Sequence, residues 1–534
     1  MLLTDILPRA MSLWPDDEAV VCGSDVFTYR DVADRVGRLA RALVGLGVAQ
    51  GDRVAVLHRN CHRMLEVSFA VVHVGAVLVP LNHRLTASDL AYILDDTSAG
   101  VLIADDGWVD LVKEAAVAAR ETPTIVWSRT GFSPDESETD LDYETVIASA
   151  ESTTLPDGCS GEHDPAAIYY TSGATGHQKG VVLTHRNNAS HALATIAELG
   201  LSDRDTWAHL APMFHLADAW ATWAISMVGG RHVMVGAFDP GAVLRELVHR
   251  RVTVTNLIPT MLNDLVNHPS VAGVSLPAFR LVMSGGAPIS PQLVRRVVEA
   301  FRCEYVQTYG LTETSPYLTF SLLKEKLTHL RDDEQMLYRS KTGRPALGVT
   351  LRVVDGDGRS VPADGCAVGE IIARGDRITP GYWRRPDLTA EAFRDGWFLT
   401  GDLATVDAEG YLDIVDRKKD VILTGGELVY STEVENALYD HPAVLETAVV
   451  GAADERLGET VTAFIVLRPG FSVAADEIIE HCRERLAHYK CPRSVELLQA
   501  LPRTGSGKIS KKALRARCSG GSSQPVHPRT ANAS

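Results

Sequence analysis

Residues 170–180 read YTSGATGHQKG, and a short apolar run at 166–169 comes directly before them. The glycines allow the backbone to turn and to expose its N–H groups. Such a nest of donors, with hydroxyl groups and a lysine beside it, suits the phosphates of a nucleotide. The stretch therefore predicts a phosphate-binding loop after a buried strand, although a plain surface loop would also be rich in Gly, Ser and Thr.

The loop does not have the spacing of a P-loop kinase or GTPase. That motif is G-x-x-x-x-G-K-[ST], with a glycine before the lysine and a hydroxyl residue after it. Here Gln178 precedes Lys179, and Gly180 follows it. The sequence therefore disfavours P-loop enzymes and leaves other nucleotide-binding classes open.

The size and charge of the chain limit its function class. It has 534 residues, well above the roughly 250–300 at which a single hydrophobic core stops growing, so several domains are expected. The formal net charge is −16, from 52 basic and 68 acidic residues. A nonspecific nucleic-acid binder needs a basic footprint. The composition therefore argues against a nucleic-acid partner, while a local anion site is still allowed.

The cysteines and the apolar runs bear on the compartment. The eight cysteines are scattered and form no C-x-x-C pair, so zinc and thioredoxin-like sites have no support. Reduced thiols are expected in a chain of this length. The first residues lack the pattern of a signal peptide, and no apolar run reaches the roughly 18 residues of a membrane span. Cytoplasmic residence is the default expectation.

Apolar periodicity predicts strands that alternate with helices on both sides of the loop. The first clear helix is expected after Thr28, which forms a capping-box pattern with Asp31. Strands are expected at 53–57, 76–80, 100–104, 233–235, 252–254 and 281–283, and helices near 64–74, 88–94, 240–250, 259–266 and 291–301. Such alternation implies parallel sheets covered by helices on both faces. The acidic stretch 129–165 is interpreted as a surface excursion.

After residue 343 the sequence pattern changes from alternating strands and helices to short β-rich runs. Short β-rich runs at 349–354, 368–373 and 411–415 are separated by Asp-Gly turns, which favours an antiparallel barrel or sheet. The predicted class is α/β, with a large N-terminal domain of two doubly wound sheets plus a β-barrel-like subdomain, and a small α+β C-terminal domain. The expected boundaries are 1–416 for the N-terminal domain, 417–518 for a small mobile C-terminal domain, and 519–534 for a flexible tail.

Six further motifs follow the loop. They are PMFH at 212–215, SGGAP at 284–288, YGLTE at 309–313, WFLTGD at 397–402, DRKKD at 416–420 with GGE at 425–427, and LPRTGSGKI at 501–509. In this order, the motifs make the chain similar to the adenylate-forming superfamily of acyl-CoA synthetases, adenylation domains and luciferases. The resemblance extends from about residue 7 to residue 516, and the pattern is closest to fatty or aryl acid–CoA ligases.

The resemblance implies a reaction in two steps. A carboxylate attacks the α-phosphate of ATP to give an acyl-adenylate and pyrophosphate, and the thiol of coenzyme A then displaces AMP. Because two anions must meet at phosphorus, cationic groups, Mg²⁺ and backbone donors have to offset their repulsion. The implied small molecules are ATP, Mg²⁺, coenzyme A and a carboxylic acid. A homodimer is a further partner that the family's habit allows.

The resemblance also assigns roles to individual residues. Lys508 matches the lysine that bridges the substrate carboxylate and the α-phosphate, and Glu313 matches the magnesium ligand. His215 stands where relatives gate the acyl tunnel, although a packed core histidine is the alternative. Residues matched to nucleotide binding are Thr171, Ser172, Gly173, Thr175, Gly176, Lys179, Gly286, Ala287, Pro288, Thr308, Tyr309, Gly310, Thr312, Asp402, Arg417, Gly425 and Gly426.

Within that set, Tyr309 and residues 286–288 match the walls around adenine, and Thr312 matches a phosphate contact. Asp402 matches the acid that takes both ribose hydroxyls, a task for paired acceptor oxygens. Arg417 resembles a second ribose or phosphate contact. Each has a plainer interpretation as core packing, a turn residue or a surface charge.

Two more residues concern movement and specificity. Lys419 stands at the hinge position, about which the small domain of the family rotates between the two half-reactions. In one orientation Lys508 enters the site, and in the other the face around residues 425–426 meets the thiol. Trp220 either lines the acid pocket or packs in the core. If it lines the pocket, its bulk favours a flat or short acid.

Two positions depart from the family pattern. Gln178 replaces a proline that often precedes the loop lysine, which suggests a less rigid loop. Leu428 replaces a common asparagine after Gly-Gly-Glu, on the strand that faces the thiol step. The acceptor could therefore be a carrier-protein thiol, or nitrite could be activated for diazotisation. A catalytically silent homologue that only binds nucleotide is a third alternative, and the intact Lys508, Glu313, Asp402 and Lys179 argue against it.

The role of Lys508 gives a direct prediction. The Lys508→Ala variant should lose acid-dependent adenylation, because the bridging cation is gone, and should still convert supplied acyl-adenylate to thioester. Pyrophosphate exchange and thioester formation measure the two steps separately. Loss of both steps in a folded variant would contradict the two-orientation interpretation.

Overall fold

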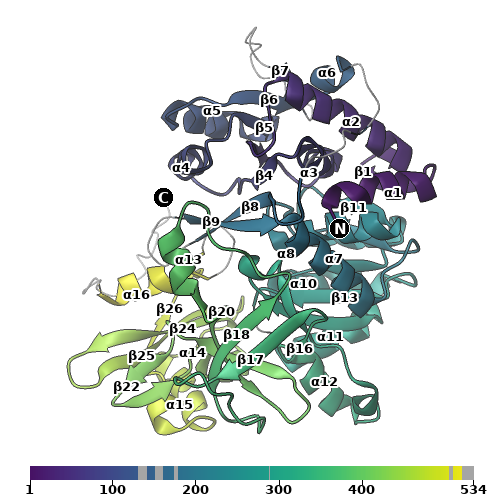
Figure 1. The fold of residues 1–534 in the computed structure, drawn as a ribbon. Helices are drawn as coiled ribbons and strands as arrows, with labels where there is room; N and C mark the ends of the chain where they lie inside the picture. The colour runs from purple at the N-terminus through teal and green to yellow at the C-terminus, as the bar shows by residue number, and fades with distance from the viewer. Residues whose placement is uncertain are drawn as a thin grey trace, which may run out of the picture. The chain divides into compact units, whose positions relative to one another are not determined.

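The computed structural model of the chain describes residues 1–129, 141–150, 155, 160–172, 178–287, 289–503 and 509–519. The chain divides into two compact units (Figure 1). The first contains Met1–Thr400 and Thr405–Asp413, and the second contains Gly401–Ala404 and Ile414–Ser534. Within the described residues, no helix is long and apolar enough to cross a bilayer.

A seven-stranded sheet in the first unit has the order β7-β6-β5-β3-β4-β8-β9. Its neighbours are parallel except β8 and β9, which form an antiparallel pair. The strands are β3 (Arg53–Leu57), β4 (Val77–Pro80), β5 (Val101–Asp105), β6 (Thr124–Ser128), β7 (Leu141–Asp142), β8 (Pro165–Ser172) and β9 (Gln178–Thr184). The helices are α2 (Tyr29–Gly45), α3 (His62–Val74), α4 (Ala87–Thr97), α5 (Val109–Ala118) and α6 (Tyr143–Ala148).

Alternate residues of these strands pack on opposite faces, as strand geometry requires. Ala55 and Leu57 pack with α4 and α5 on one face, whereas Val54 and Val56 pack with α2 and α3 on the other. Figure 1 shows the same arrangement around the strands at the top of the view. The sheet is therefore covered on both sides, as the alternating pattern predicts.

A nine-stranded sheet has the order β16-β15-β14-β13-β12-β10-β11-β1-β2, with a parallel centre and antiparallel pairs at its ends. The strands are β1 (Glu18–Cys22), β2 (Asp25–Thr28), β10 (Thr206–His209), β11 (Arg231–Met234), β12 (Val254–Asn256), β13 (Leu281–Gly285), β14 (Glu304–Gly310), β15 (Tyr317–Phe320) and β16 (Arg344–Pro345). The helices are α1 (Ile6–Leu13), α7 (His185–Leu199), α8 (Leu216–Val228), α9 (Pro240–His249), α10 (Pro259–Asn267), α11 (Pro291–Phe301) and α12 (Asp332–Ser340).

The two large sheets share one core. Helices α1, α7 and α8 cover one face of the nine-stranded sheet and pack in the same buried cluster as α2 and α3. Helices α9, α10 and α11 cover its other face with a separate cluster. This shared core fixes the two sheets against each other within the first unit.

A five-stranded sheet occupies the position of the predicted barrel-like subdomain. Its order is β17-β18-β20-β19, with β21 paired to β20. The elements are β17 (Val349–Val354), β18 (Gly369–Gly375), α13 (Pro386–Ala392), β19 (Phe393–Arg394), β20 (Trp397–Val406) and β21 (Leu412–Arg417). The predicted α/β class, with parallel sheets in a large domain and a small C-terminal domain, is confirmed.

The second unit has its own sheet, with the order β23-β22-β25-β24 and β26 beside β25. Its elements are β22 (Ile422–Thr424), β23 (Glu427–Val429), α14 (Ser431–Tyr439), β24 (Val444–Asp454), β25 (Gly458–Leu467), α15 (Ala475–Arg483), β26 (Ser494–Leu497) and α16 (Lys511–Ser519). Ser519 of the predicted tail ends α16, and the rest of that tail lies outside the described residues.

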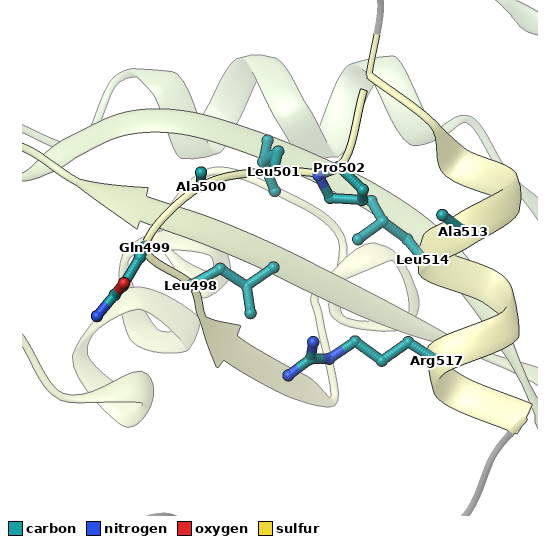
Figure 2. A pocket seen from close by; sticks show the side chains of 8 residues that line it. All are labelled: Leu498, Gln499, Ala500, Leu501, Pro502, Ala513, Leu514 and Arg517. Carbon is teal, nitrogen blue, oxygen red and sulfur yellow. The ribbon is translucent and has the colours of Figure 1, made fainter. Parts of the chain in front are cut away.

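Helix α16 is anchored by both apolar and ionic contacts. Leu514 is buried with Leu501 in a small cluster, and Figure 2 shows Leu498 and Leu514 directed into the space between α16 and the segment after β26. Lys511 pairs with Glu435 at 2.8 Å, and Arg515 pairs with Asp420 at 2.6 Å. The helix that follows the segment of Lys508 is thereby tied to the charged run 416–420.

The capping box at Thr28 and Asp31 is confirmed, with an Asp31 N–H to Thr28 Oγ1 distance of 3.2 Å. Two sequence interpretations need correction. The first clear helix is preceded by α1, β1 and β2, which have 8, 5 and 4 residues. Residues 141–150 are not a surface excursion, because Tyr143 is buried and Glu144 pairs with Arg35 at 2.9 Å.

Buried histidines make the stability of the fold depend on pH. Burial lowers the pKa of His58 to about 4, although Asp105 partly opposes the shift. The Nε2 atom of this ring lies 2.7 Å from the hydroxyl of Ser128. Burial likewise lowers the pKa of His185 to about 4.

Because these pKa values lie below those of the unfolded chain, the unfolded state binds more protons between about pH 6.5 and pH 4. Stability should therefore be full above pH 6.5 and fall towards pH 4, by about 3 kcal/mol from His58 alone. Urea midpoints at pH 7.5, 6 and 5 measure this slope. The His58→Gln variant should show a shallower slope, and an unchanged slope would contradict the assignment.

Candidate active site

The predicted phosphate loop joins two neighbouring antiparallel strands. Thr171 of β8 lies opposite Lys179 of β9, and Ser172 lies opposite Gln178. The loop residues Gly173, Thr175 and Gly176 lie outside the described residues. Among the described residues, the buried hydroxyl of Thr171 has no hydrogen-bond partner. A buried, unpartnered hydroxyl beside a lysine fits the binding of a polar ligand such as a phosphate.

The ends of β13 and β14 lie side by side and carry the predicted nucleotide walls. Gly285 pairs with Thr308, whose hydroxyl donates to the Ser284 carbonyl at 2.9 Å. Gly286 has φ of +81° and is exposed together with Ala287, and Pro288 lies outside the described residues. Carboxyl ends of neighbouring parallel strands are the usual ligand site of such sheets.

Tyr309 and Gly310 end β14, where the chain approaches itself closely. A Cβ atom on Gly310 would lie 1.8 Å from the Pro316 carbonyl oxygen, so only glycine fits there. The half-buried ring of Tyr309 precedes this contact. The short turn Thr312–Thr314 follows and places Glu313 against β9. The glycine thus allows the turn that brings Glu313 to the loop lysine.

Lys179, Glu313 and Tyr382 form a compact triangle. The Lys179 Nζ atom lies 3.0 Å from Glu313 Oε1 and 2.7 Å from the Tyr382 hydroxyl oxygen. The Tyr382 hydroxyl donates to the same Glu313 oxygen at 2.9 Å, and Lys179 Nζ lies 3.9 Å from the centre of the tyrosine ring. The Glu313 side chain is 7% exposed and that of Lys179 is 25% exposed. The triangle therefore holds a buried negative charge beside a cation that still reaches solvent.

The segment 379–383 fixes Tyr382 in this place. The Gly381 carbonyl accepts from the Val182 N–H, and the Trp383 N–H donates to the Gly180 carbonyl. The segment therefore lies along β9. The Thr379 N–H donates to the Glu313 carbonyl at 2.8 Å. One segment is thus bonded to both the lysine strand and the glutamate turn.

Sequence reasoning missed Tyr382. Its only local signal is the Gly-Tyr-Trp run at 381–383, and nothing in that run shows that it would lie along β9. The lysine that Tyr382 contacts lies 203 residues earlier in the chain. Burial, and then the Glu313 charge, raise the pKa of Tyr382 far above its usual range. The hydroxyl therefore keeps its proton and acts as a donor.

The described residues could hold a magnesium ion only together with a bound nucleotide. Among them, no group of three or more His, Cys, Asp and Glu side chains gathers as a metal site. Magnesium is commonly held by one or two carboxylates together with substrate phosphates. Glu313, the buried carboxylate beside the phosphate-type loop, fits that arrangement, and it would hold the ion jointly with a bound nucleotide.

His215 and Trp220 lie at the start of α8. His215 is the residue before this helix, and its half-buried ring contacts Phe214 at a centroid distance of 4.8 Å. Trp220 is 1% exposed, and its indole N–H donates to Tyr317 Oη at 3.2 Å. The ring packs against Trp207 at 5.0 Å. Trp220 thus belongs to a buried aromatic cluster beside α8.

The remaining predicted residues belong to the second unit. Arg417 pairs with the buried Asp402 at 3.1 Å. Gly425 and Gly426 form the turn between β22 and β23 with φ of +60° and +89°. Lys419 is exposed, and its carbonyl accepts from Arg515 at 3.4 Å. Lys508 lies outside the described residues.

The chain is similar to known proteins over most of its length. Residues 7–383 match the AMP-binding enzymes, and residues 433–508 match the AMP-binding enzyme C-terminal domain. Feruloyl-CoA synthase of Amycolatopsis is 37% identical, over 95% of this chain and 97% of that protein. The peroxisomal benzoate–CoA ligase of Arabidopsis thaliana is 34% identical, over 95% and 92%.

Solved structures show the same likeness. An anthranilate CoA ligase in complex with anthranoyl-AMP has a TM-score of 0.87 and 27% identity, over 97% of each chain. O-succinylbenzoate coenzyme A synthetase from Bacillus subtilis, in complex with ATP and magnesium ion, has a TM-score of 0.82 and 27% identity, over 96% of this chain and 99% of that one.

Proposed function

The chain belongs to the AMP-binding enzyme family, and we propose that it joins a short or aromatic carboxylic acid to coenzyme A. It is an AMP-forming acyl-CoA synthetase, which activates its acid with ATP and then transfers the acyl group to coenzyme A. The observation that carries the site assignment is the triangle of Lys179, Glu313 and Tyr382 beside the predicted phosphate loop.

In the first step, a carboxylate oxygen of the acid attacks the α-phosphorus, and the bond from this phosphorus to the bridging oxygen of pyrophosphate breaks. Lys179 binds the departing phosphates, and Glu313 would hold the magnesium ion. When bound with ATP, magnesium supplies positive charge against the repulsion between the phosphates and the acid. Lys508 bridges the acid and the α-phosphate.

The nucleotide is held by small residues and by acceptors. Residues 286–288 and Tyr309 are assigned to the adenine walls, because Gly285 and Thr308, which precede Gly286 and Tyr309, pair at two adjoining strand ends. Asp402 accepts from the ribose hydroxyls, and Arg417 pairs with this buried carboxylate at 3.1 Å and orients it. In the second step, the thiol sulfur attacks the acyl carbon, and AMP leaves with the bonding electron pair. Lys419 is assigned to the hinge between the steps.

Two observations support the substrate class. Three of the four relatives named above are named for feruloyl, benzoate and anthranilate groups, and the fourth for o-succinylbenzoate, so all four names contain an aromatic acid. An acid pocket beside α8 would be bounded by the packed rings of Trp220, Trp207 and Tyr317, whose bulk favours a flat or short acid over a long chain. His215, at the start of the same helix, is assigned to the mouth of the acid pocket.

The relatives also favour coenzyme A over a carrier protein or nitrite. Leu428 is 53% exposed on β23, the strand that is assigned to the thiol step. Cytoplasmic residence is proposed because the described cysteines are free thiols, as in reducing compartments. A homodimer is also proposed, only because members of the family often form dimers.

The test is acid-dependent exchange of labelled pyrophosphate into ATP, across benzoic, cinnamic, butyric and long-chain acids. Exchange should be fastest with the aromatic and short acids, and addition of coenzyme A should then give a thioester. Preference for long-chain acids would overturn the substrate proposal. Exchange that yields no thioester would overturn coenzyme A as the acceptor.

A further inference from the structure

The Glu313 carboxylate accepts hydrogen bonds from two donors that differ in charge and in mobility. Lys179 is a flexible cation on the strand after the phosphate loop, and Tyr382 is a neutral donor fixed by backbone hydrogen bonds. We propose that Tyr382 is a positioning residue, whose hydroxyl holds the Glu313 carboxylate in place while Lys179 leaves it for the phosphates of ATP and frees it for magnesium. The inference rests on the proposed roles of Lys179 and Glu313.

The charges explain why Glu313 needs a second hydrogen-bond donor. In this structure Lys179 neutralises Glu313 at 3.0 Å, and the carboxylate is 7% exposed. A buried carboxylate that loses its cation partner is strongly destabilised. When Lys179 turns to the phosphates, Glu313 therefore needs a donor that stays behind. The Tyr382 hydroxyl, at 2.9 Å from the same oxygen, is that donor.

Tyr382 is well placed to stay. Its N–H donates to the Thr389 hydroxyl at 3.0 Å, and its two chain neighbours bond to β9. Gly381 has φ of +150°, and a Cβ atom there would lie 2.6 Å from the Thr389 methyl carbon, so the segment packs tightly on α13. The ring also lies under the Lys179 ammonium. The tyrosine thus cannot follow the lysine when the lysine moves.

The order of events follows from these contacts. Lys179 donates to the Tyr382 oxygen, and Tyr382 donates its proton to Glu313, so the three groups form one closed ring of hydrogen bonds. Departure of Lys179 opens the ring and leaves the Tyr382–Glu313 bond intact. Without the hydroxyl, Lys179 would be held more tightly by Glu313, and the carboxylate would be free to swing once Lys179 left.

The test uses Tyr382→Phe, which keeps the ring and removes only the hydroxyl. Calorimetric titration with ATP at a series of Mg²⁺ concentrations needs no acid and no turnover. The variant should require about tenfold to a hundredfold more Mg²⁺ for half-maximal ATP binding, the range expected when a bond to a charged group is lost. Pyrophosphate exchange should recover at high Mg²⁺, with kcat less affected than the apparent KM for MgATP.

The matched control is Tyr143→Phe. The Tyr143 hydroxyl donates to the buried Glu66 carboxylate at 2.8 Å, beside the seven-stranded sheet and on different elements from the triangle. This control makes the same chemical change at another buried Tyr–Glu pair. It should unfold at a lower temperature and keep the Mg²⁺ requirement of the wild type. An equal rise in the Mg²⁺ requirement of both variants would reduce Tyr382 to a structural role and overturn the inference.

A second background separates the two partners of Tyr382. In Lys179→Met, loss of the tyrosine hydroxyl should still raise the Mg²⁺ requirement, because Glu313 is still released. If the effect disappears in this background, Tyr382 acts on Lys179 alone, and the inference is wrong. An unchanged Mg²⁺ requirement in Tyr382→Phe itself would also overturn it. Because ATP binding is measured without acid, a failure of the acid panel for the wild type would count against the proposed function and not against this inference.

Discussion

A buried carboxylate between a lysine and a tyrosine hydroxyl is the contact on which the site depends. Taking the charge of Glu313 out of water costs several kcal/mol unless it is compensated, so its partners have to be in place when the chain folds. The lysine comes from β9, the carboxylate from the turn after β14, and the hydroxyl from the segment before α13. The first unit must therefore bring three distant segments together.

The sheets supply that meeting point. The strands β13 and β14 end side by side, and Gly310 allows the chain to turn within contact of the residues near Pro316. The hairpin of β8 and β9 closes the edge of the other sheet. The shared core around α7 and α8 holds the two sheets together. The loop lysine on one sheet and the glutamate turn on the other therefore keep their positions relative to each other. Packing far from the site thus determines its charge geometry.

Much of this could be predicted from the sequence because local signals were strong. The Thr28 capping box, the buried strand 53–57 and the helix 291–301 follow from spacing alone, and motifs in a fixed order identified the family. Tyr382 could not be found, because its role arises from a contact 203 residues away from Lys179. The same limit applies to Glu144, whose pairing with Arg35 turned an apparently exposed acidic stretch into part of the fold.

The central claim is that the Glu313 carboxylate serves the activation of ATP and is not merely a buried partner for Lys179. Glu313→Gln keeps the size and the hydrogen-bonding capacity of the side chain and removes its charge. With an acid that the wild type accepts, acid-dependent pyrophosphate exchange should fall about a hundredfold or more in this variant, the scale seen when one group that stabilises developing charge is removed. Exchange at the wild-type rate in Glu313→Gln would contradict the account.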